Sequence, residues 1–283
     1  MATVSSQVEV GALLREWRER RRVTQLDLSL DTGISARHLS FVETGRSRPG
    51  RDTLLRIVKH LDVPFREQNR LLLATGHAPA FPERSLDDPD LAPVHEAFDL
   101  ILARHDPYPA VVVDRQWNLV AVNSSLQTLT EGADIDPSLL EPPINVLRLG
   151  LHPRGLAPLM PNLSEWRAHF RDRLKQQVET IADENLQALL EEIDSYPDGE
   201  NERDPDLARA QGSVLGPLKL RAPDGGELSF LGMFATFDTP FEVTSSELAI
   251  ELLFPADRAT GETLQSLARN RRESGDSRTG GSA

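Results

Sequence analysis

Apolar positions early in the chain recur at helical spacing and predict two short helices. The residues that would hold these helices together are Leu28, Ile34, Leu39 and Val42. Thr24 and Ser35 are good N-cap residues, and Gly33 can take the left-handed conformation that turns the chain between them. The pattern therefore predicts a helix over 25–31, a turn at Gly33 and a second helix that Gly45 ends.

The same helical spacing continues over residues 53–61 and 64–74, so we expect a compact all-α domain over residues 11–76. Residues 1–10 are expected to form a flexible N-terminus. Residues 77–93 are rich in proline and acidic residues and have no sustained apolar period. Such a composition is typical of a linker between two domains.

The second half of the chain mixes strand and helix patterns. Runs at 110–114 and 117–123 read as two strands, 163–193 has helical spacing, and apolar strand-like runs return after residue 216. Strands, then helices, then strands predict an α+β, PAS-like domain over residues 94–258. Residues 259–283 are polar and rich in Gly and Ser, so we expect a disordered tail.

The two short helices have the spacing of a helix-turn-helix, whose second helix commonly enters a DNA major groove. The outward-facing residues of that helix are Ala36, Arg37, Ser40 and Phe41. The arginines that directly follow it are Arg46, Arg48 and Arg51. Spacing alone also allows a plain helical hairpin in a bundle, but guanidinium groups suit phosphate contacts, and these flanking charges favour DNA binding.

Charge is divided unevenly along the chain. Residues 1–78 hold 13 Lys and Arg against 9 Asp and Glu, a net charge of +4, so with −13 for the whole chain the remainder carries −17. A basic domain beside an acidic one can still bind phosphate, and repulsion would limit nonspecific DNA binding. The alternative is that the acidic surface serves only solubility.

The segment from Gly11 to Gly76 resembles the Cro/CI-type helix-turn-helix family, also called the XRE family, through LLREWRERRRVTQLDLSLDTGISARHLSFVETGRSRP. The resemblance implies that Gln25 contacts phosphate and that Ala36, Arg37 and Phe41 occupy base-facing positions. Phe41 departs from the polar residues common there; it could touch a thymine methyl or pack on its own domain.

The same resemblance implies a structural role for one charged pair. Arg18 and Glu43 match positions that form a salt bridge in the family, so neither is counted as a DNA-reading residue.

The second half resembles the ligand-binding domain of MmyB-like transcription regulators. The matching segments are GHAPAFPER, YPAVVVDRQWNLVAVN, NVLRLGLHPRGLAP and GPLKLRAPDGGELSFLGMFATFDTPFEVTSSELAIELLFPAD. The resemblance implies a PAS-like sensor joined to a Cro/CI-type domain, with a small, apolar or fatty-acid-like ligand. His77 stands where the family more usually has Tyr.

A ligand pocket would use apolar residues at strand and helix spacing, with a polar group for the ligand's head. Its candidate apolar residues are Trp117, Leu119 and Ala121 on one strand and Trp166 and Phe170 on a helix. His152 and Arg154 could fix a carboxylate by charge-assisted hydrogen bonds. Ordinary core packing, and a plain turn at Pro153, are the alternatives.

Other protein classes find little support. The chain has no HExxH, GxSxG, P-loop or dinucleotide fingerprint, so we expect no enzyme, and with no cysteine and no metal-like histidine spacing we expect no metal or cofactor. A haem site at His152 or His169 remains open. No apolar run could span a bilayer, and MATVSSQVEV lacks a signal-peptide pattern, so we expect no membrane association and a cytoplasmic location.

These observations predict a one-component transcription regulator that binds double-stranded operator DNA and responds to a small-molecule ligand. A homodimer is expected because one recognition helix reads only a few base pairs. The alternative is a protein-interaction regulator, antitoxin-like or sigma-modulating, whose helical domain contacts protein. An enzyme with a DNA-binding appendage is the third possibility.

Overall fold

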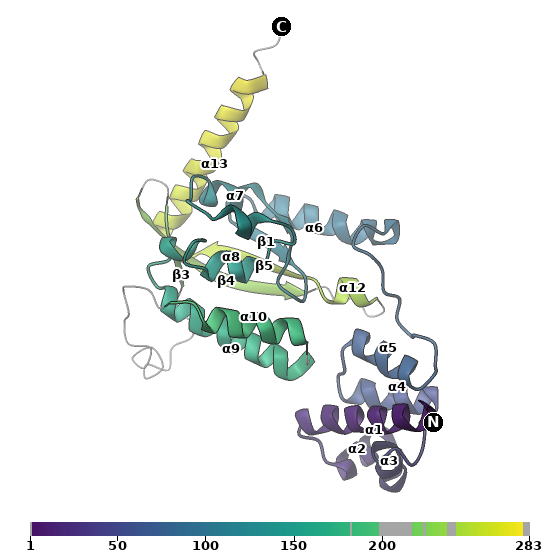
Figure 1. The fold of residues 1–283 in the computed structure, drawn as a ribbon. Helices are drawn as coiled ribbons and strands as arrows, with labels where there is room; N and C mark the ends of the chain where they lie inside the picture. Colours follow the sequence, from purple (N-terminus) through teal and green to yellow (C-terminus); the bar gives the residue numbers. More distant parts are fainter. Residues whose placement is uncertain (1, 182, 198–216, 223–224, 237–241, 280–283) are drawn as a thin grey trace. The chain divides into compact units, whose positions relative to one another are not determined.

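The chain divides into two compact units, drawn in Figure 1. The computed structural model describes residues 2–181, 183–197, 217–222, 225–236 and 242–279. The N-terminal unit spans residues 1–88 and also includes 179–181 and 239–246, while the C-terminal unit comprises the rest. The boundary after residue 88 lies inside the linker expected at 77–93.

The N-terminal unit is built around five helices. Their bounds are α1 (Ala2–Arg20), α2 (Gln25–Thr32), α3 (Ala36–Glu43), α4 (Arg51–His60) and α5 (Phe65–Ala74). Each helix contributes apolar side chains to one core, which includes Leu14 of α1, Leu39 of α3 and Leu54 of α4. The short α12 (Val243–Ser246) also belongs to this unit. The expected all-α domain is confirmed.

The first helix begins at Ala2, so the flexible N-terminus expected at 1–10 is wrong for most of its length. Val10 is buried in the core, and Gly11 lies so close to α3 that an added Cβ would meet the carbonyl oxygen of Val42 at 2.5 Å. Once these contacts fix the later turns of α1, adding residues to an existing helix costs little free energy.

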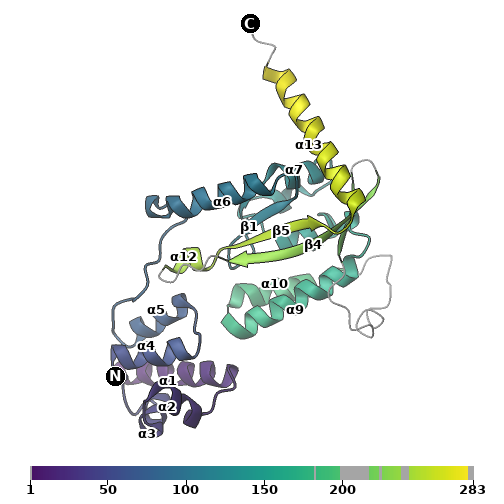
Figure 2. The ribbon, with the colours of Figure 1, turned by 180° about the vertical axis from the view of Figure 1, so that it is seen from behind.

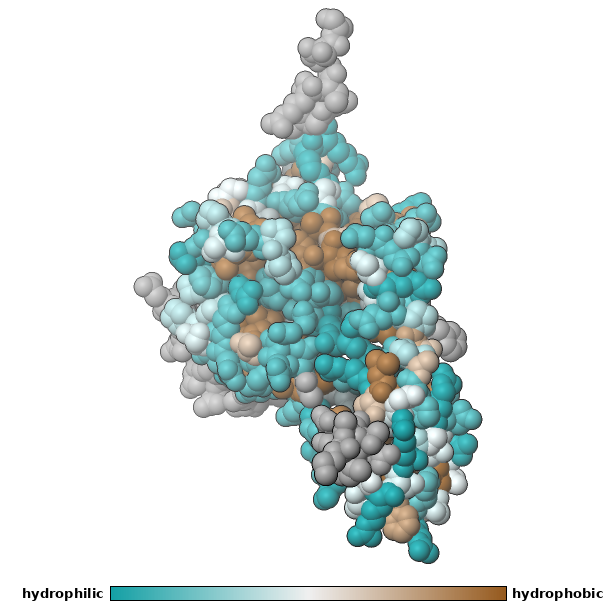
Figure 3. Space-filling model, turned by 45° about the vertical axis from the view of Figure 1, so that its right-hand side comes forward, coloured by the Kyte–Doolittle hydropathy of each residue, from teal (hydrophilic) through white to brown (hydrophobic). Residues whose placement is uncertain are grey.

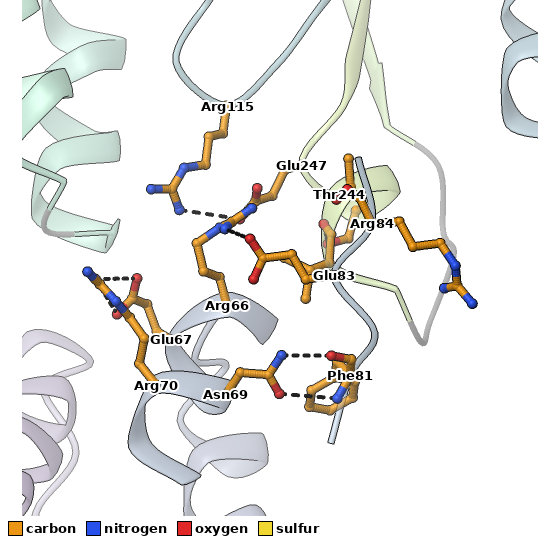
Figure 4. Close-up of polar contacts among 12 residues, drawn as sticks. Arg66, Glu67, Asn69, Arg70, Phe81, Glu83, Arg84, Arg115, Thr244 and Glu247 are labelled. Atoms are coloured by element: carbon orange, nitrogen blue, oxygen red, sulfur yellow. Dashed lines mark hydrogen bonds and ion pairs between the residues drawn. The ribbon is translucent and has the colours of Figure 1, made fainter. Parts of the chain in front are cut away.

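Part of the expected linker packs against the N-terminal unit rather than running free. Asn69 donates to the carbonyl of Phe81 at 2.7 Å and accepts from the backbone nitrogens of Ala80 and Phe81, as Figure 4 shows for Phe81. The Phe81 ring stacks on Phe65 with ring centroids 4.2 Å apart. A side-chain amide that satisfies three backbone bonds fixes this segment to α5.

The C-terminal unit contains a five-stranded antiparallel sheet in the order β2-β1-β5-β4-β3. The strands are β1 (Ala110–Val113), β2 (Leu119–Val122), β3 (Leu218–Arg221), β4 (Glu227–Thr236) and β5 (Ala249–Pro255). The last strand in the chain lies at the centre of the sheet, so the fold closes only when β5 pairs with β1 and β4.

Helices cover both faces of this sheet, with α6 and α13 on one side and α9 and α10 on the other in both Figure 1 and Figure 2. Within the described residues, the helices of the unit are α6 (Ala92–His105), α7 (Ser124–Thr130), α8 (Val146–Leu151), α9 (Leu163–Ile181), α10 (Glu184–Asp194) and α13 (Arg258–Thr279), with 3-10 turns η1 (Pro89–Leu91), η2 (Pro137–Leu140) and η3 (Ala157–Leu159). The expected α+β class is confirmed.

Residues 258–279 form helix α13, so the disordered tail expected at 259–283 is wrong over the part that the structure describes. Thr260, Leu264 and Ala268 are buried at a spacing of four residues. Arg271 further along the helix forms an ion pair with Asp106, at 2.9 Å. The buried stripe of α13 contains one leucine between two small residues. Such a weakly apolar stripe does not stand out in the sequence, so the segment was expected to be a disordered tail.

Candidate functional site

The helix-turn-helix forms as the cap residues predict. Thr24 caps α2 in a reciprocal capping box with Asp27, Gly33 turns the chain with φ of 67°, and the Ser35 side chain accepts from His38 at the start of α3. The four apolar residues expected between the helices are all buried. These local signals are short range, so they fix α2 and α3 relative to each other.

A buried ion pair joins the end of α3 to α1. Arg18 donates to both carboxylate oxygens of Glu43, at 2.7 and 2.9 Å, and a third guanidinium nitrogen donates to the carbonyl of Val23 at 2.9 Å. Hydrogen bonding to Glu43 raises the pKa of Arg18. Both residues are only 9% exposed, so the pair expected from the family resemblance holds the fold together and is shielded from DNA.

Gln25 extends this network. Its Nε2 donates to Oε2 of Glu43 at 2.7 Å, from the first residue of α2. An amide nitrogen has two hydrogens, so one donor remains for a further acceptor. The helix start that would meet a phosphate is therefore tied to the same carboxylate that anchors α3.

The outer face of α3 carries the four residues expected there. Arg37 is exposed, while Ala36, Ser40 and Phe41 are half-buried. The Arg37 guanidinium carbon lies 5.4 Å from the centroid of the Phe41 ring, one turn further along the helix. This cation-π contact limits the orientations of Arg37 and gives Phe41 a role in positioning it.

The arginines around α3 fall into two groups. Arg46, Arg48 and Arg51 are exposed, and the Arg48 guanidinium packs over Gly76, where a larger residue would push the Arg48 side chain aside. Arg21, which precedes α2, donates instead to the carbonyls of Leu61 and Asp62. Arg21 thus joins two turns of the fold. Fewer arginines near the helix-turn-helix are therefore available to bind phosphate than the sequence contains.

The C-terminal unit contains an apolar cavity of about 350 Å³. It lies on one face of the sheet, against Val111 of β1, Leu218 of β3 and Leu253 of β5. Its other walls come from α7, α8, α9 and the segments around η2 and η3. A mostly apolar cavity with few polar groups is typical of a small-molecule site.

Two of the seven residues expected in a ligand pocket, Leu119 and Phe170, line this cavity. The remaining five are not among its lining residues; they are Trp117, Ala121, His152, Arg154 and Trp166.

Trp117 is displaced by an unexpected turn. It has φ of 67° and lies before β2 rather than on it, because Asp114 accepts from the backbone nitrogens of Gln116 and Asn118 and lengthens the turn. The Trp117 indole donates to Gln177 at 2.8 Å. With this turn the expected alternation of Trp117, Leu119 and Ala121 along one strand is wrong.

The expected head-group residues are engaged in local contacts. Nδ1 of His152 accepts from the backbone nitrogen of Arg154 at 3.0 Å, and the Arg154 side chain forms an ion pair with Asp136. Trp166 packs against Phe170, with ring centroids 5.4 Å apart. The segment that contains Pro153 is thus a hydrogen-bonded turn.

Charged residues that the sequence reasoning missed do line the cavity. Glu251 lies in the middle of β5, and Arg221 lies at the end of β3. Burial raises the pKa of Glu251 to about 7, although the charge of Arg173 opposes the shift. The available signal was a single acid inside the apolar run AIELLFP, since charges are rarely buried in a central strand without a reason.

Among the described residues, no group of three or more His, Cys, Asp or Glu side chains is placed to hold a metal ion. His169, considered for haem, contacts the rings of Trp166 and Phe170, and burial lowers its pKa. No helix in the described part of the chain is both long and apolar enough to cross a membrane.

Two family models match the chain. Residues 14–68 match a helix-turn-helix model, and residues 94–267 match the model of the MmyB-like transcription regulator ligand binding domain. The chain belongs to the MmyB-like transcription regulator family. This MmyB-like regulator combines a DNA-binding helix-turn-helix with a ligand-binding domain, in the order that the sequence predicted.

The chain also resembles two individual proteins, at low sequence identity. The regulator is 29% identical over 109 residues to the uncharacterized HTH-type transcriptional regulator RghRB of Bacillus subtilis (strain 168), over 38% of this chain and 76% of that protein. A solved structure of an RNA-binding light-oxygen-voltage receptor matches with 14% identity and a TM-score of 0.27, covering 96% of this chain and 66% of that one. The structural likeness is too low to support an argument.

Proposed function

We propose that this regulator inserts α3 into the major groove of operator DNA and that a small apolar ligand in the C-terminal cavity changes its affinity for that DNA. The observation that carries the proposal is the position of Arg37, which is exposed on the outer face of α3 while Arg18 and Glu43 fix the inner side of the same helix. A charged, oriented side chain on a rigid helix is suited to base recognition.

The residues around Arg37 take supporting roles. Arg37 donates to a guanine edge, with Ala36, Ser40 and Phe41 close to the neighbouring bases. Gln25 contacts phosphate through its second amide hydrogen, and the exposed arginines Arg46, Arg48 and Arg51 bind the phosphate backbone. Base contacts thus come from one helix face, and phosphate contacts surround it.

The ligand is an aliphatic molecule, of the fatty-acid-like class that the family resemblance suggested. A volume of about 350 Å³ lies at the lower end of the range of small-molecule sites. The walls are mainly leucines, with few hydrogen-bonding groups to orient a polar molecule. Burial of an alkyl chain would stabilise the complex by roughly 0.8 kcal/mol for each methylene group.

The regulator acts as a homodimer in the cytoplasm, because two half-sites give the specificity that one helix lacks. On the face drawn in Figure 3, apolar side chains gather over the C-terminal unit within a largely hydrophilic surface. Exposed apolar residues of this unit include Leu100, Leu231 and Met233. Exposed apolar patches commonly mark protein interaction sites.

The experiment that tests the DNA-binding role compares binding of the full chain to its own promoter region and to shuffled DNA of equal length, over a series of salt concentrations. We expect a preference for the promoter and an affinity that falls steeply with salt. Equal binding to both, or none, would contradict an operator at the promoter and favour a protein-interaction role. Repeating the promoter titration with an aliphatic ligand tests the regulatory step.

A further inference from the structure

Three exposed apolar side chains lie side by side on the face of the sheet opposite the cavity. Glu251 and Leu253 of β5 line the cavity, so the next residue, Phe254, points to the other face. In the register of the sheet Leu231 of β4 pairs with Phe254, and Met233 follows two residues along on the same face. Their exposed fractions are 51% for Leu231, 48% for Met233 and 36% for Phe254. These three residues form what we call the outer apolar patch.

Two helices border the outer apolar patch. The ring of His105, the last residue of α6, packs edge-on against Phe254 with centroids 4.8 Å apart, and its Nε2 donates to the carbonyl of Leu253 at 3.1 Å. Near the start of α13, Thr260 accepts from the backbone nitrogen of Ser229 at 3.0 Å, two residues before the patch on β4. Both helices lie on this side of the sheet in Figure 1 and Figure 2. The exposed fractions of the patch residues show that neither helix covers them.

The contiguity of the patch distinguishes it from ordinary surface exposure. Apolar side chains exposed singly are common on protein surfaces, whereas adjacent ones form a continuous apolar surface whose burial is favourable. Directly paired residues of an antiparallel sheet have Cβ atoms roughly 5 Å apart, so Leu231 and Phe254 adjoin. Leu100 of α6 is the contrasting case. It is 58% exposed, but it lies two residues from each of the buried Phe98 and Leu102, and therefore on the opposite side of the helix.

The charges at the edge of the patch favour a second copy of this chain as its partner. With −13 for the whole chain and +4 for residues 1–78, the remainder carries −17, which opposes close approach of two copies over most of that surface. Beside the patch, however, Lys219 and Glu227 form an ion pair at 2.9 Å, and Arg258 and Glu262 at the start of α13 form another at 2.7 Å. An edge that carries both signs can meet itself across a two-fold axis, with Lys219 of one copy facing Glu227 of the other.

We propose that two copies of this chain pair through the outer apolar patch, sheet face to sheet face, about a two-fold axis. This inference rests on the proposed function, which requires a homodimer for two half-sites, and it assigns the surface that joins the copies. The three apolar side chains form the centre of the interface, and the charged edge forms its rim. The patch lies in the C-terminal unit, so pairing there leaves α3 of each copy available to DNA.

The first test measures the mass of the full chain in solution by sedimentation equilibrium. We expect the wild type to be a dimer. Leu231→Glu places two carboxylates on the shared face and should weaken self-association by roughly a hundredfold. The side chain of Leu231 is half exposed, so the variant should fold, and its thermal unfolding transition checks this. The matched control is Leu100→Glu, which makes the same change at an exposed leucine outside the patch and should remain a dimer.

A second test detects the patch at the interface directly. The chain has no cysteine, so Met233→Cys introduces its only thiol. In a two-fold interface centred on the patch, this thiol lies close to the same thiol of the other copy. A short bis-maleimide should therefore join two copies of Met233→Cys into a covalent dimer on a denaturing gel. At the same protein concentration it should leave Leu100→Cys as single chains.

The outcomes separate failure of this inference from failure of the proposed function. A wild type that is monomeric both alone and on promoter DNA overturns the homodimer and this inference together, whatever else covers the patch. If the wild type pairs only on promoter DNA, the same variants are compared in that complex. A dimer that Leu231→Glu leaves intact, or that Leu73→Glu on the exposed side of α5 dissociates instead, overturns the assignment of the surface alone. Equal crosslinking of Leu100→Cys and Met233→Cys has the same meaning.

Discussion

The two units of this regulator arrange their functional residues along the sequence in opposite ways. The residues proposed to bind DNA in the N-terminal unit lie within one continuous segment, from Gln25 to Arg51. The cavity of the C-terminal unit is lined by residues from Val111 to Leu253, on strands and helices far apart in the sequence. A local motif can be recognised from spacing, whereas a cavity depends on pairings that form only when the chain has folded.

The largest expected effect follows from removing the buried carboxylate that joins α1, α2 and α3. Glu43→Ala leaves Arg18 buried without its partner, which should lower the free energy of unfolding of the N-terminal unit by about 3 to 5 kcal/mol. Chemical denaturation followed by circular dichroism measures this loss. The transition of the C-terminal unit should stay in place, which would show that the two units are stabilised separately.

Arg15→Ala is the matched control, because its ion pair with Glu19 lies on the same helix but is exposed, with 63% and 54% of the two side chains accessible. Exposed ion pairs stabilise proteins little, so this variant should unfold like the wild type. A loss equal to that of Glu43→Ala would show that the burial of the Arg18 pair is irrelevant to its strength.

A smaller effect is expected in the C-terminal unit, as a dependence of stability on pH. The folded-state pKa of Glu251 is raised to about 7 by burial, so between pH 4.5 and 7 the carboxyl ionises in the unfolded chain before it does in the folded one. The contribution of Glu251 to stability should therefore be largest below pH 4.5 and fall as the pH rises to 7, by up to about 3 kcal/mol. Denaturation of Glu251→Gln measured over the same range should lack this component. An identical pH profile in both proteins would contradict the raised pKa.

These differences explain how far the sequence alone could lead. Cap residues such as Thr24 and Ser35 act on their own helices, so the helix-turn-helix followed from spacing. Trp117 was misplaced because Asp114 lengthens the hairpin turn, which strand alternation does not reveal. Glu251 was missed because its position in the cavity wall depends on the pairing of β5 with β1 and β4. Local hydrogen bonds join residues that are close in sequence, so a short segment predicts them. The residues that line a cavity depend on the register in which distant strands pair.

Arg37 allows the recognition face to be tested without disturbing the fold. Arg37→Ala removes an exposed side chain, so the protein should unfold as before while operator binding weakens by about 1 to 3 kcal/mol and the preference at one base pair relaxes. Affinities for the operator and for its single-base variants measure both effects. Arg46→Ala is the matched control, and it should weaken binding to every sequence alike. Uniform weakening by Arg37→Ala would instead assign Arg37 to phosphate.

The smallest effect is expected for Gln25, which belongs to both the structural network and the DNA-binding face. Gln25→Ala removes one hydrogen bond to Glu43 and the donor proposed for phosphate, so binding should weaken by about 1 kcal/mol with an unchanged base preference. Gln25→Glu should weaken binding further, because a second carboxylate would face both Glu43 and the phosphate. Titrations of the operator and of shuffled DNA give the comparison. A changed base preference in Gln25→Ala would mean that the network orients α3, and that the two roles of Gln25 cannot be separated.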